Sequence, residues 1–142
     1  MKAHLNRRYH FSASHRLHTD AYDAAKNLAV FGKCNNPHGH GHNYTVQVTL
    51  SGHVDPATGM VCNLSELDAF AQTNLLSRFD HTNLNTLDCF ANTVSTTENL
   101  SVEIYRIFQG FTGAHLERVH VEETSNNSFN YAGEAMPASG TI

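Results

Sequence analysis

Hydrophobic and polar residues alternate along several stretches of the chain, and this period of two predicts β-strands. The clearest alternation covers residues 43–50, where every second side chain is apolar: Tyr44, Val46, Val48 and Leu50. Residues 7–17 alternate more loosely and place on one face Tyr9, Phe11, Ala13 and His15. Residues 116–121 predict a third strand and residues 128–131 a short last one. Residues 60–62 are expected to continue the second strand beyond a turn at residues 55–59.

Two stretches between these strands carry apolar residues at helical spacing. The first helix is expected to begin at Asn63 or Ser65 as its N-cap, and its apolar stripe consists of Leu64, Leu67, Ala71 and Leu75. The second helix is expected to begin at a capping box, Ser95-Thr96-Thr97-Glu98. Its stripe consists of Leu100, Ile104, Ile107, Phe108 and Phe111, and Gly110 or Gly113 ends it.

The order of two strands, two helices and two strands predicts a single α+β domain over residues 1–142, with a four-stranded antiparallel sheet and both helices on one face. A chain of 142 residues is large enough to bury a core of this kind. Residues 1–6 and 135–142 lie outside the pattern, and we expect both segments to be flexible.

Composition and charge argue against several classes of partner. The net charge of −4 disfavours nucleic acid, because binding its phosphates requires clustered Lys and Arg. The nine basic residues are nonetheless enough to line one small anion pocket. No apolar run approaches the roughly 20 residues of a membrane span, and residues 1–8 lack the apolar stretch of a secretory signal. Three cysteines without a disulfide-framework spacing favour a reducing compartment, so we expect a cytoplasmic protein.

Histidine is unusually frequent, because the chain contains eleven histidines against nine Lys plus Arg. His40 and His42 stand two residues apart beside a predicted strand, so both imidazoles point to one face and can reach one metal ion. His15 lies on the strand expected to pair with it and can add a third nitrogen. Three imidazoles with an open position are typical of a catalytic zinc site. His38 and His40 have the same spacing, so two pairs are possible, and the second lies nearer the regular strand.

Cys34 has two possible roles near such a site. As a fourth ligand it would close the coordination and make the zinc structural. As a nucleophile or base it would need a cationic neighbour that favours the thiolate, and Lys33 or the metal can provide one. The residues alone leave both roles open.

Two pairs of residues are candidates for acid–base chemistry or ligand binding. Asp80 and His81 follow the first predicted helix, where the two can act on a common third group such as Cys34. A histidine that is merely stabilised by the helix dipole is the alternative. Glu122 and Glu123 end a predicted strand, so alternation sends one inward and one outward. An inward carboxylate requires donors, which a bound heterocycle with N–H groups can supply, whereas a solvated edge strand is the simpler interpretation.

Seven short motifs, spread from Tyr9 to Glu134, occur in an order that resembles the 6-pyruvoyl tetrahydropterin synthase family. The first three are Phe11-Ser12-Ala13-Ser14-His15-Arg16-Leu17, Phe31-Gly32-Lys33-Cys34-Asn35-Asn36-Pro37 and Gly39-His40-Gly41-His42-Asn43-Tyr44. The others are Asp55-Pro56 with Thr58-Gly59-Met60-Val61, Asp80-His81, Ser95-Thr96-Thr97-Glu98-Asn99, and Glu123-Thr124 with Asn126-Asn127. Each motif is weak by itself, but their order is specific.

The resemblance implies an architecture beyond the single chain. It implies a T-fold (tunnelling fold), in which three subunits close their sheets into a β-barrel and two trimers stack as a hexamer. Such closure would remove the exposed edges that a lone sheet leaves. It also implies an active site between subunits, so that a monomer would be inactive.

The resemblance further implies a substrate and a reaction. The substrate would be 7,8-dihydroneopterin triphosphate, which loses triphosphate and becomes 6-pyruvoyl-tetrahydropterin without an external redox cofactor. Zn²⁺ would be bound by His15, His40 and His42 and would acidify the side-chain hydroxyls of the substrate and the neighbouring C–H bonds.

The remaining site residues also follow from the resemblance. Cys34 would take the carbon-bound proton, and Asp80 with His81 would tune and relay protons. Glu123 would anchor the pterin ring through its N–H groups. We expect three neighbours to line the same pocket, Thr96, Thr97 and Glu98, and two cations to contact the triphosphate, Lys33 and Arg16.

Three alternative functions stay open at this level. The 6-carboxytetrahydropterin synthase of queuosine biosynthesis takes the same substrate and releases acetaldehyde, and that branch tends to place its cysteine four residues before the first ligand of the His-x-His pair. Cys34 lies six residues before His40, as in the pyruvoyl branch, but four before His38. The other two alternatives are a pterin- or purine-binding module with structural zinc, and a different zinc-dependent hydrolase on the same ligands.

Overall fold

A five-stranded sheet, with strand order β3-β1-β2-β4-β5, is the framework of the protein. The structure is a computed structural model, and it describes residues 1–134. The strands are β1 (Lys2–His15), β2 (His40–His53), β3 (Thr82–Asn83), β4 (His115–Thr124) and β5 (Asn127–Tyr131). All neighbours pair antiparallel except β3, which lies parallel to β1. The predicted α+β class is therefore confirmed.

The long pair β1–β2 runs without a break from Lys2 opposite His53 to His15 opposite His40. One face of this pair is buried, and it carries the alternating residues that the pattern predicted, among them Tyr9, Phe11, Tyr44 and Val46. Since side chains alternate between faces, the other face of the same strands carries the polar residues.

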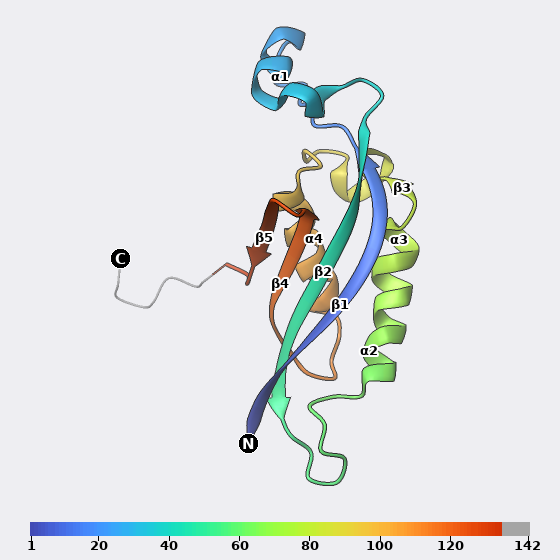
Figure 1. The fold of residues 1–142 in the computed structure, drawn as a ribbon, viewed down its shortest axis with the longest axis vertical. Coiled ribbons are helices and arrows are strands. Elements are labelled where there is room, and N and C mark those ends of the chain that lie inside the picture. The colour runs from blue at the N-terminus through green and yellow to red at the C-terminus, as the bar shows by residue number, and fades with distance from the viewer. Residues whose placement is uncertain (135–142) are drawn as a thin grey trace, which may run out of the picture.

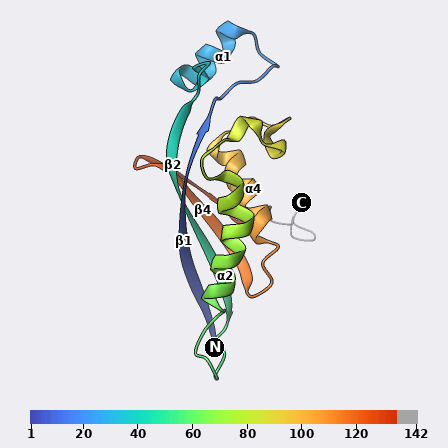
Figure 2. The same cartoon turned by 90° about the vertical axis from the view of Figure 1, so that its right-hand side faces the viewer.

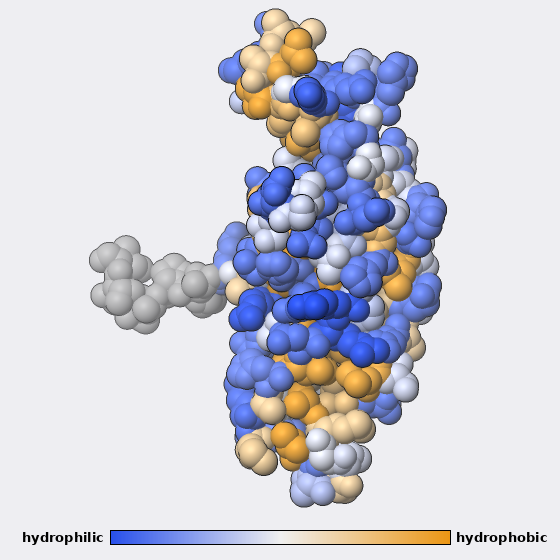
Figure 3. Space-filling view, in the orientation of Figure 1, coloured by the Kyte–Doolittle hydropathy of each residue, from blue (hydrophilic) through white to orange (hydrophobic). Residues whose placement is uncertain are grey.

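Helices cover only the buried face of the sheet (Figures 1 and 2). They are α2 (Leu64–Ala71), a π-helical segment (Gln72–Leu76), α3 (Ser77–Phe79) and α4 (Thr97–Phe108). Their fully buried residues pack onto the strands: Leu67, Leu75, Phe79, Leu100, Ile104 and Phe108. Figure 3 shows the other face of the sheet, away from the helices, and this face is largely hydrophilic across its middle.

Helix α1 (Ala24–Phe31) stands apart from this two-layer body and packs mainly on the 3₁₀ turn η1 (Gly32–Asn35) that follows it (Figure 1). Asp23 caps it by accepting a hydrogen bond from the Lys26 N–H at 2.8 Å. Leu28 and Val30 on this helix are 62% and 56% exposed. This helix was not predicted, because its apolar residues do not form a stripe that packs on the core.

An ion pair joins the sheet to the helical layer. Arg7 donates two hydrogen bonds to the Asp68 carboxylate, at 3.0 and 2.7 Å, and the Tyr9 hydroxyl donates a third at 2.8 Å. These donors, with the Arg7 bond first, hold the pKa of Asp68 below its ordinary value. The contact fixes where α2 lies along β1.

Several sequence-based expectations are corrected by the structure. The sheet has five strands rather than four, because the short β3 after α3 adds to the edge of β1. Residues 2–6, expected to be flexible, form the first part of β1, since β2 is long enough to pair with them. Residues 60–62 lie in a bend rather than a strand. Helix α4 is capped by Thr96 and not by Ser95. The expectation for residues 135–142 falls outside the described residues.

Within residues 1–134, no helix combines the length and the apolar character that crossing a membrane requires.

The core packing predicts a large stability cost for truncating α4. Leu100→Ala should lower the free energy of unfolding by about 2–5 kcal/mol, because Leu100 is fully buried and its removal leaves a cavity. Urea denaturation followed by circular dichroism, at one fixed protein concentration, measures this loss. Leu64→Ala is the matched control, since Leu64 is 37% exposed. Equal losses in the two variants would contradict the assigned core.

Candidate functional site

Three histidine side chains converge where β1 ends and β2 begins. His15 is the last residue of β1 and pairs with His40, the first residue of β2, while His42 follows on the same face. One ring nitrogen of each lies within 4.8 Å of the others. The Nε2 atoms of His15 and His40 are 3.0 Å apart, and the rings of His40 and His42 have centroids 4.7 Å apart.

The turn into β2 brings these residues together. Gly39 adopts φ +72°, which favours glycine, and a Cβ there would lie 3.1 Å from the carbonyl oxygen of His15. Glycine therefore lets the chain enter β2 close against the end of β1. His38, just before it, is exposed and lies outside the cluster, so the structure selects His40 and His42 over His38 and His40.

Burial keeps two of the three histidines, His15 and His40, in the neutral form that binds metals. His15 is 2% exposed, and burial is the main cause that lowers its pKa, with the neighbouring imidazoles adding to it. Burial also lowers the pKa of His40, followed by the charge of His42. Both are therefore neutral at pH 7. The carbonyl oxygen of Ser95 lies 2.7 Å from His15 Nδ1 and accepts its hydrogen, which leaves Nε2 as a free electron-pair donor.

Two buried ring nitrogens, His40 Nδ1 and His42 Nε2, have no hydrogen-bond partner among the residues that the structure describes. Buried polar atoms are rarely left unpaired, and the Nε2 atoms of His15 and His40, 3.0 Å apart, can either share one hydrogen or direct both lone pairs at a cation. The three histidines thus fit a transition-metal ion. Within residues 1–134 no cysteine or carboxylate joins them as a fourth ligand, so the set leaves an open position.

Glu123 lies beside this cluster and is the inward member of the glutamate pair, whereas Glu122 is exposed. The Glu123 side chain is 17% exposed, and its Oε1 is 3.7 Å from His42 Nε2. The Thr97 hydroxyl donates a hydrogen bond to Oε2. One carboxylate oxygen is therefore held by the protein, and the other is available to a ligand.

Tyr44 lies beneath these groups with its hydroxyl buried. Burial raises the pKa of Tyr44, and the negative charges of Glu123 and, less strongly, of a Cys34 thiolate raise it further.

Cys34 lies in η1 and is half-buried. Its carbonyl oxygen accepts the Leu17 N–H at 2.8 Å, which holds η1 against the end of β1. Its sulfur does not belong to the metal-binding group. The arrangement therefore disfavours Cys34 as a fourth ligand.

Asp80 and His81 lie at the β3 edge of the sheet, directly after α3. The Asp80 Oδ1 atom accepts the Ser12 N–H at 2.9 Å and lies 3.0 Å from His81 Nδ1. The Ser12 bond is the main cause that lowers the pKa of Asp80. His81 adopts φ +58°, an unfavourable backbone for a residue with a Cβ, and donates its N–H to the Ser12 carbonyl at 2.6 Å. The two neighbours do contact each other.

The same pair is not joined to Cys34 by any hydrogen bond or ion pair in the described part of the chain. The His81 side chain is 82% exposed and lines a cavity of about 420 Å³, which it shares with Ser12, Asn43 and His42. In a single chain, Asp80 and His81 therefore lie at the surface.

The remaining predicted site residues do not gather at one position. Thr96 is the N-cap of α4 and accepts the Asn99 N–H at 3.2 Å. Glu98 and Lys33 are exposed, and within residues 1–134 no hydrogen bond or ion pair joins either of them to the histidine cluster. Arg16 donates from Nε to the Asn35 carbonyl at 3.0 Å. It lines a cavity of about 290 Å³ together with His15 and His38.

Two groups at the histidine site were not predicted from the sequence: the Ser95 carbonyl and the Tyr44 hydroxyl. A backbone carbonyl has no sequence signal. Tyr44 belongs to an alternating apolar face, so its hydroxyl looked like part of the core.

Comparison with known proteins identifies the family. Residues 4–134 match the profile of the family described as 6-pyruvoyl tetrahydropterin synthase. The 6-pyruvoyl tetrahydrobiopterin synthase of Homo sapiens is 47% identical over 135 residues, which cover 94% of this chain and 93% of that protein. The chain belongs to the 6-pyruvoyl tetrahydropterin synthase family.

Solved structures agree with this family. The 6-pyruvoyl tetrahydropterin synthase of Caenorhabditis elegans superposes with a TM-score of 0.90 at 39% identity, over 94% of this chain and 97% of that chain. The 6-carboxy-5,6,7,8-tetrahydropterin synthase of Bacillus subtilis is 29% identical over 111 residues, which cover 75% of this chain and 66% of that protein. The family inferred from the seven motifs is confirmed, and the similarity is greater to proteins named for the pyruvoyl product.

The lowered pKa of His15 predicts how the metal-free protein responds to pH. The unfolded chain binds a proton near the ordinary pKa of about 6.5, whereas the folded chain does so only at lower pH. The unfolded state therefore holds more protons between these values, and stability falls as pH drops below about 6.5. In the presence of a chelator, His15→Gln should reduce the drop in melting temperature between pH 7.5 and 5.5.

The matched control is His53→Gln, because His53 is exposed. It should keep the pH dependence of the unmodified protein. An unchanged slope in His15→Gln would show that His15 is not held neutral by burial.

Proposed function

We propose that this protein is a zinc-dependent enzyme that converts 7,8-dihydroneopterin triphosphate to 6-pyruvoyl-tetrahydropterin with loss of triphosphate. The observation that carries this proposal is the cluster of three histidines with an open position, directly beside the inward carboxylate of Glu123. Family membership supports the substrate, and the donor set supports zinc, which prefers imidazole nitrogen in open catalytic sites.

His15, His40 and His42 would hold the ion. When bound, Zn²⁺ supplies a Lewis acid that makes the hydroxyls of the substrate side chain, and the C–H bonds beside them, more acidic. The Ser95 carbonyl orients His15 for this task by accepting its Nδ1 hydrogen.

Glu123 is the proposed anchor of the pterin ring. The Glu123 Oε2 atom is held by Thr97. The low exposure of the carboxylate strengthens any hydrogen bond that the free Oε1 accepts from an N–H group. Substrates without those ring N–H groups would leave the carboxylate unpaired, which gives the site selectivity. Thr97 is therefore a positioning residue, and Thr96 serves the same end by capping α4.

Cys34 is the proposed base that takes the carbon-bound proton, and Asp80 with His81 relays protons. Because His81 is presented at the surface, we propose that the pair completes its site at a contact between subunits. The uncovered edges at β3 and β5 support assembly into T-fold trimers with a closed barrel, and two trimers would form a hexamer. Lys33 and Arg16 stay proposed contacts of the triphosphate, and the free cysteines fit a cytoplasmic location.

The choice of the pyruvoyl product over the carboxy product has one structural support. The first ligand of the His-x-His pair is His40, which lies six residues after Cys34, and the exposed His38 is not in the cluster. The shorter spacing of the carboxy branch is thus not the one that the geometry favours.

Product analysis of Cys34→Ala tests the function. The zinc-loaded protein should release triphosphate and yield the pyruvoyl pterin in mass spectrometry. Cys34→Ala should lower turnover by about 100-fold or more, as expected for loss of a proton-transfer group, and should keep its zinc. Cys62→Ala is the matched control, because Cys62 is also half-buried but lies far along the chain near α2.

Other outcomes would point to the alternatives. A carboxy pterin with acetaldehyde would move the protein to that branch. Unchanged substrate, together with loss of zinc and of thermal stability in Cys34→Ala, would indicate a binding module with structural zinc. Hydrolysis of a different ester with the pterin unchanged would indicate a zinc hydrolase.

Removal of a ligand tests the metal separately. Elemental analysis should find about one zinc per chain, and His42→Ala should hold almost none, because two imidazoles bind zinc far more weakly than three. His10→Ala, on the polar face of β1, should keep the full zinc content. Zinc retained by His42→Ala would place the ion elsewhere.

A further inference from the structure

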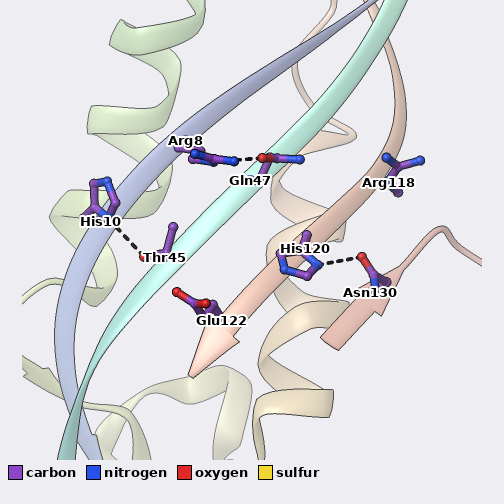
Figure 4. A pocket seen from close by; sticks show the side chains of 8 residues that line it. All are labelled: Arg8, His10, Thr45, Gln47, Arg118, His120, Glu122 and Asn130. Atoms are coloured by element: carbon purple, nitrogen blue, oxygen red, sulfur yellow. Dashed lines mark hydrogen bonds between the residues drawn. The ribbon is translucent and has the colours of Figure 1, made fainter. Parts of the chain in front are cut away.

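The uncovered face of the sheet has a cavity of its own, with a volume of about 550 Å³ (Figure 4). Four strands line it, and the side chains that matter here are Arg8, Gln47, Arg118, His120, Glu122 and Asn130. These residues alternate out of phase with His40, His42 and Tyr44, so they lie on the face opposite to the histidine cluster.

The strand register fixes how the lining groups are spaced. Arg8 is opposite Gln47, Gln47 is opposite His120, and His120 is opposite Asn130, so one row crosses four strands. Arg118 lies one step along β4, opposite Thr49. With strands about 4.8 Å apart and same-face residues about 7 Å apart, the two arginines flank Gln47 at a distance that long side chains can close. Figure 4 shows them on either side of it.

The charges in this cavity are unbalanced at one end. Arg7, Arg78 and Arg106 each pair with a carboxylate, but within residues 1–134 neither Arg8 nor Arg118 has one within 4.0 Å. Arg8 Nε instead donates to Gln47 Oε1 at 2.9 Å, which leaves its terminal nitrogens free and turns the Gln47 amide N–H₂ toward the cavity. Asn130 Oδ1 lies 2.8 Å from His120 Nδ1 and orients that ring. The one carboxylate that lines the cavity, Glu122, lies in the next row, opposite Thr45.

We propose that this cavity binds a multiply charged oxyanion of the phosphate type between Arg8 and Arg118, above Gln47. Guanidinium groups match the oxygens of phosphate with paired donors, and the amide of Gln47 adds a neutral donor between them. The volume accommodates two or more linked phosphate groups. Glu122 marks the end of the site, because its charge repels the anion.

Calorimetric titration of the full-length, assembled protein with inorganic diphosphate at low ionic strength tests the site. Arg8→Gln and Arg118→Gln should each weaken binding by about tenfold or more, as expected for loss of a charge-assisted bond. Arg106→Gln removes the same charge from the helical face and should leave the affinity unchanged. Binding should also weaken as salt is added.

Glu122→Gln provides a test that misfolding cannot imitate. Removing the repelling carboxylate should tighten diphosphate binding several-fold. Titration with ADP separates two sources of the same chemistry: equal affinity indicates recognition of the phosphates alone, and tighter binding indicates added contacts from a nucleoside.

Three results would overturn the proposal. They are no binding at millimolar diphosphate, equal weakening by Arg106→Gln, and full affinity in Arg8→Gln and Arg118→Gln. The last result would place any bound anion elsewhere, for example beside Arg16 and Lys33.

Discussion

The register between β1 and β2 is the constraint on which both sites depend. This long antiparallel pair has two different faces, and its last rung sets His15 opposite His40. A slip by one residue would move every side chain of one strand to the other face. The apolar residues would then face water, and His42 would leave the core side. Burial of Tyr9, Phe11, Tyr44 and Val46 therefore also fixes the geometry of the three clustered histidines.

The start of α4 gives the site its second fixed point. Three successive residues there have three different partners: Ser95 accepts from His15, Thr96 caps the helix, and Thr97 donates to Glu123. Because the helix is held on the sheet by Leu100 and Ile104, its first turn cannot move away from the histidines without exposing core residues. The packing thus positions the groups that contact His15 and Glu123, so the helix cap and these groups share one short motif.

The sequence predicted the main strands, two of the helices and the positions of the three histidines, because burial on one face leaves a strong periodic signal. The helix α1 was missed, since Leu28 and Val30 are exposed and show no stripe. The strand β3 is two residues long and too short to alternate. At the site, alternation correctly separated Glu122 from Glu123, and the inward Glu123 continues the phase of the buried Val119 and Val121. The choice between His38 and His42 as the partner of His40 needed the turn at Gly39, where the chain passes close to the His15 carbonyl.

The two faces of one sheet create opposite electrostatic conditions from the same strands. On the covered face, burial keeps imidazoles neutral, and a neutral imidazole is the form that donates an electron pair to a metal. On the uncovered face, solvent lets Arg8 and Arg118 stay charged without a carboxylate partner. Two cations on one face of a chain with net charge −4 give an uneven distribution, which concentrates anion attraction there. Strand alternation therefore places a cluster suited to a metal and one suited to an oxyanion on opposite faces of the same sheet, at different points along β1 and β2.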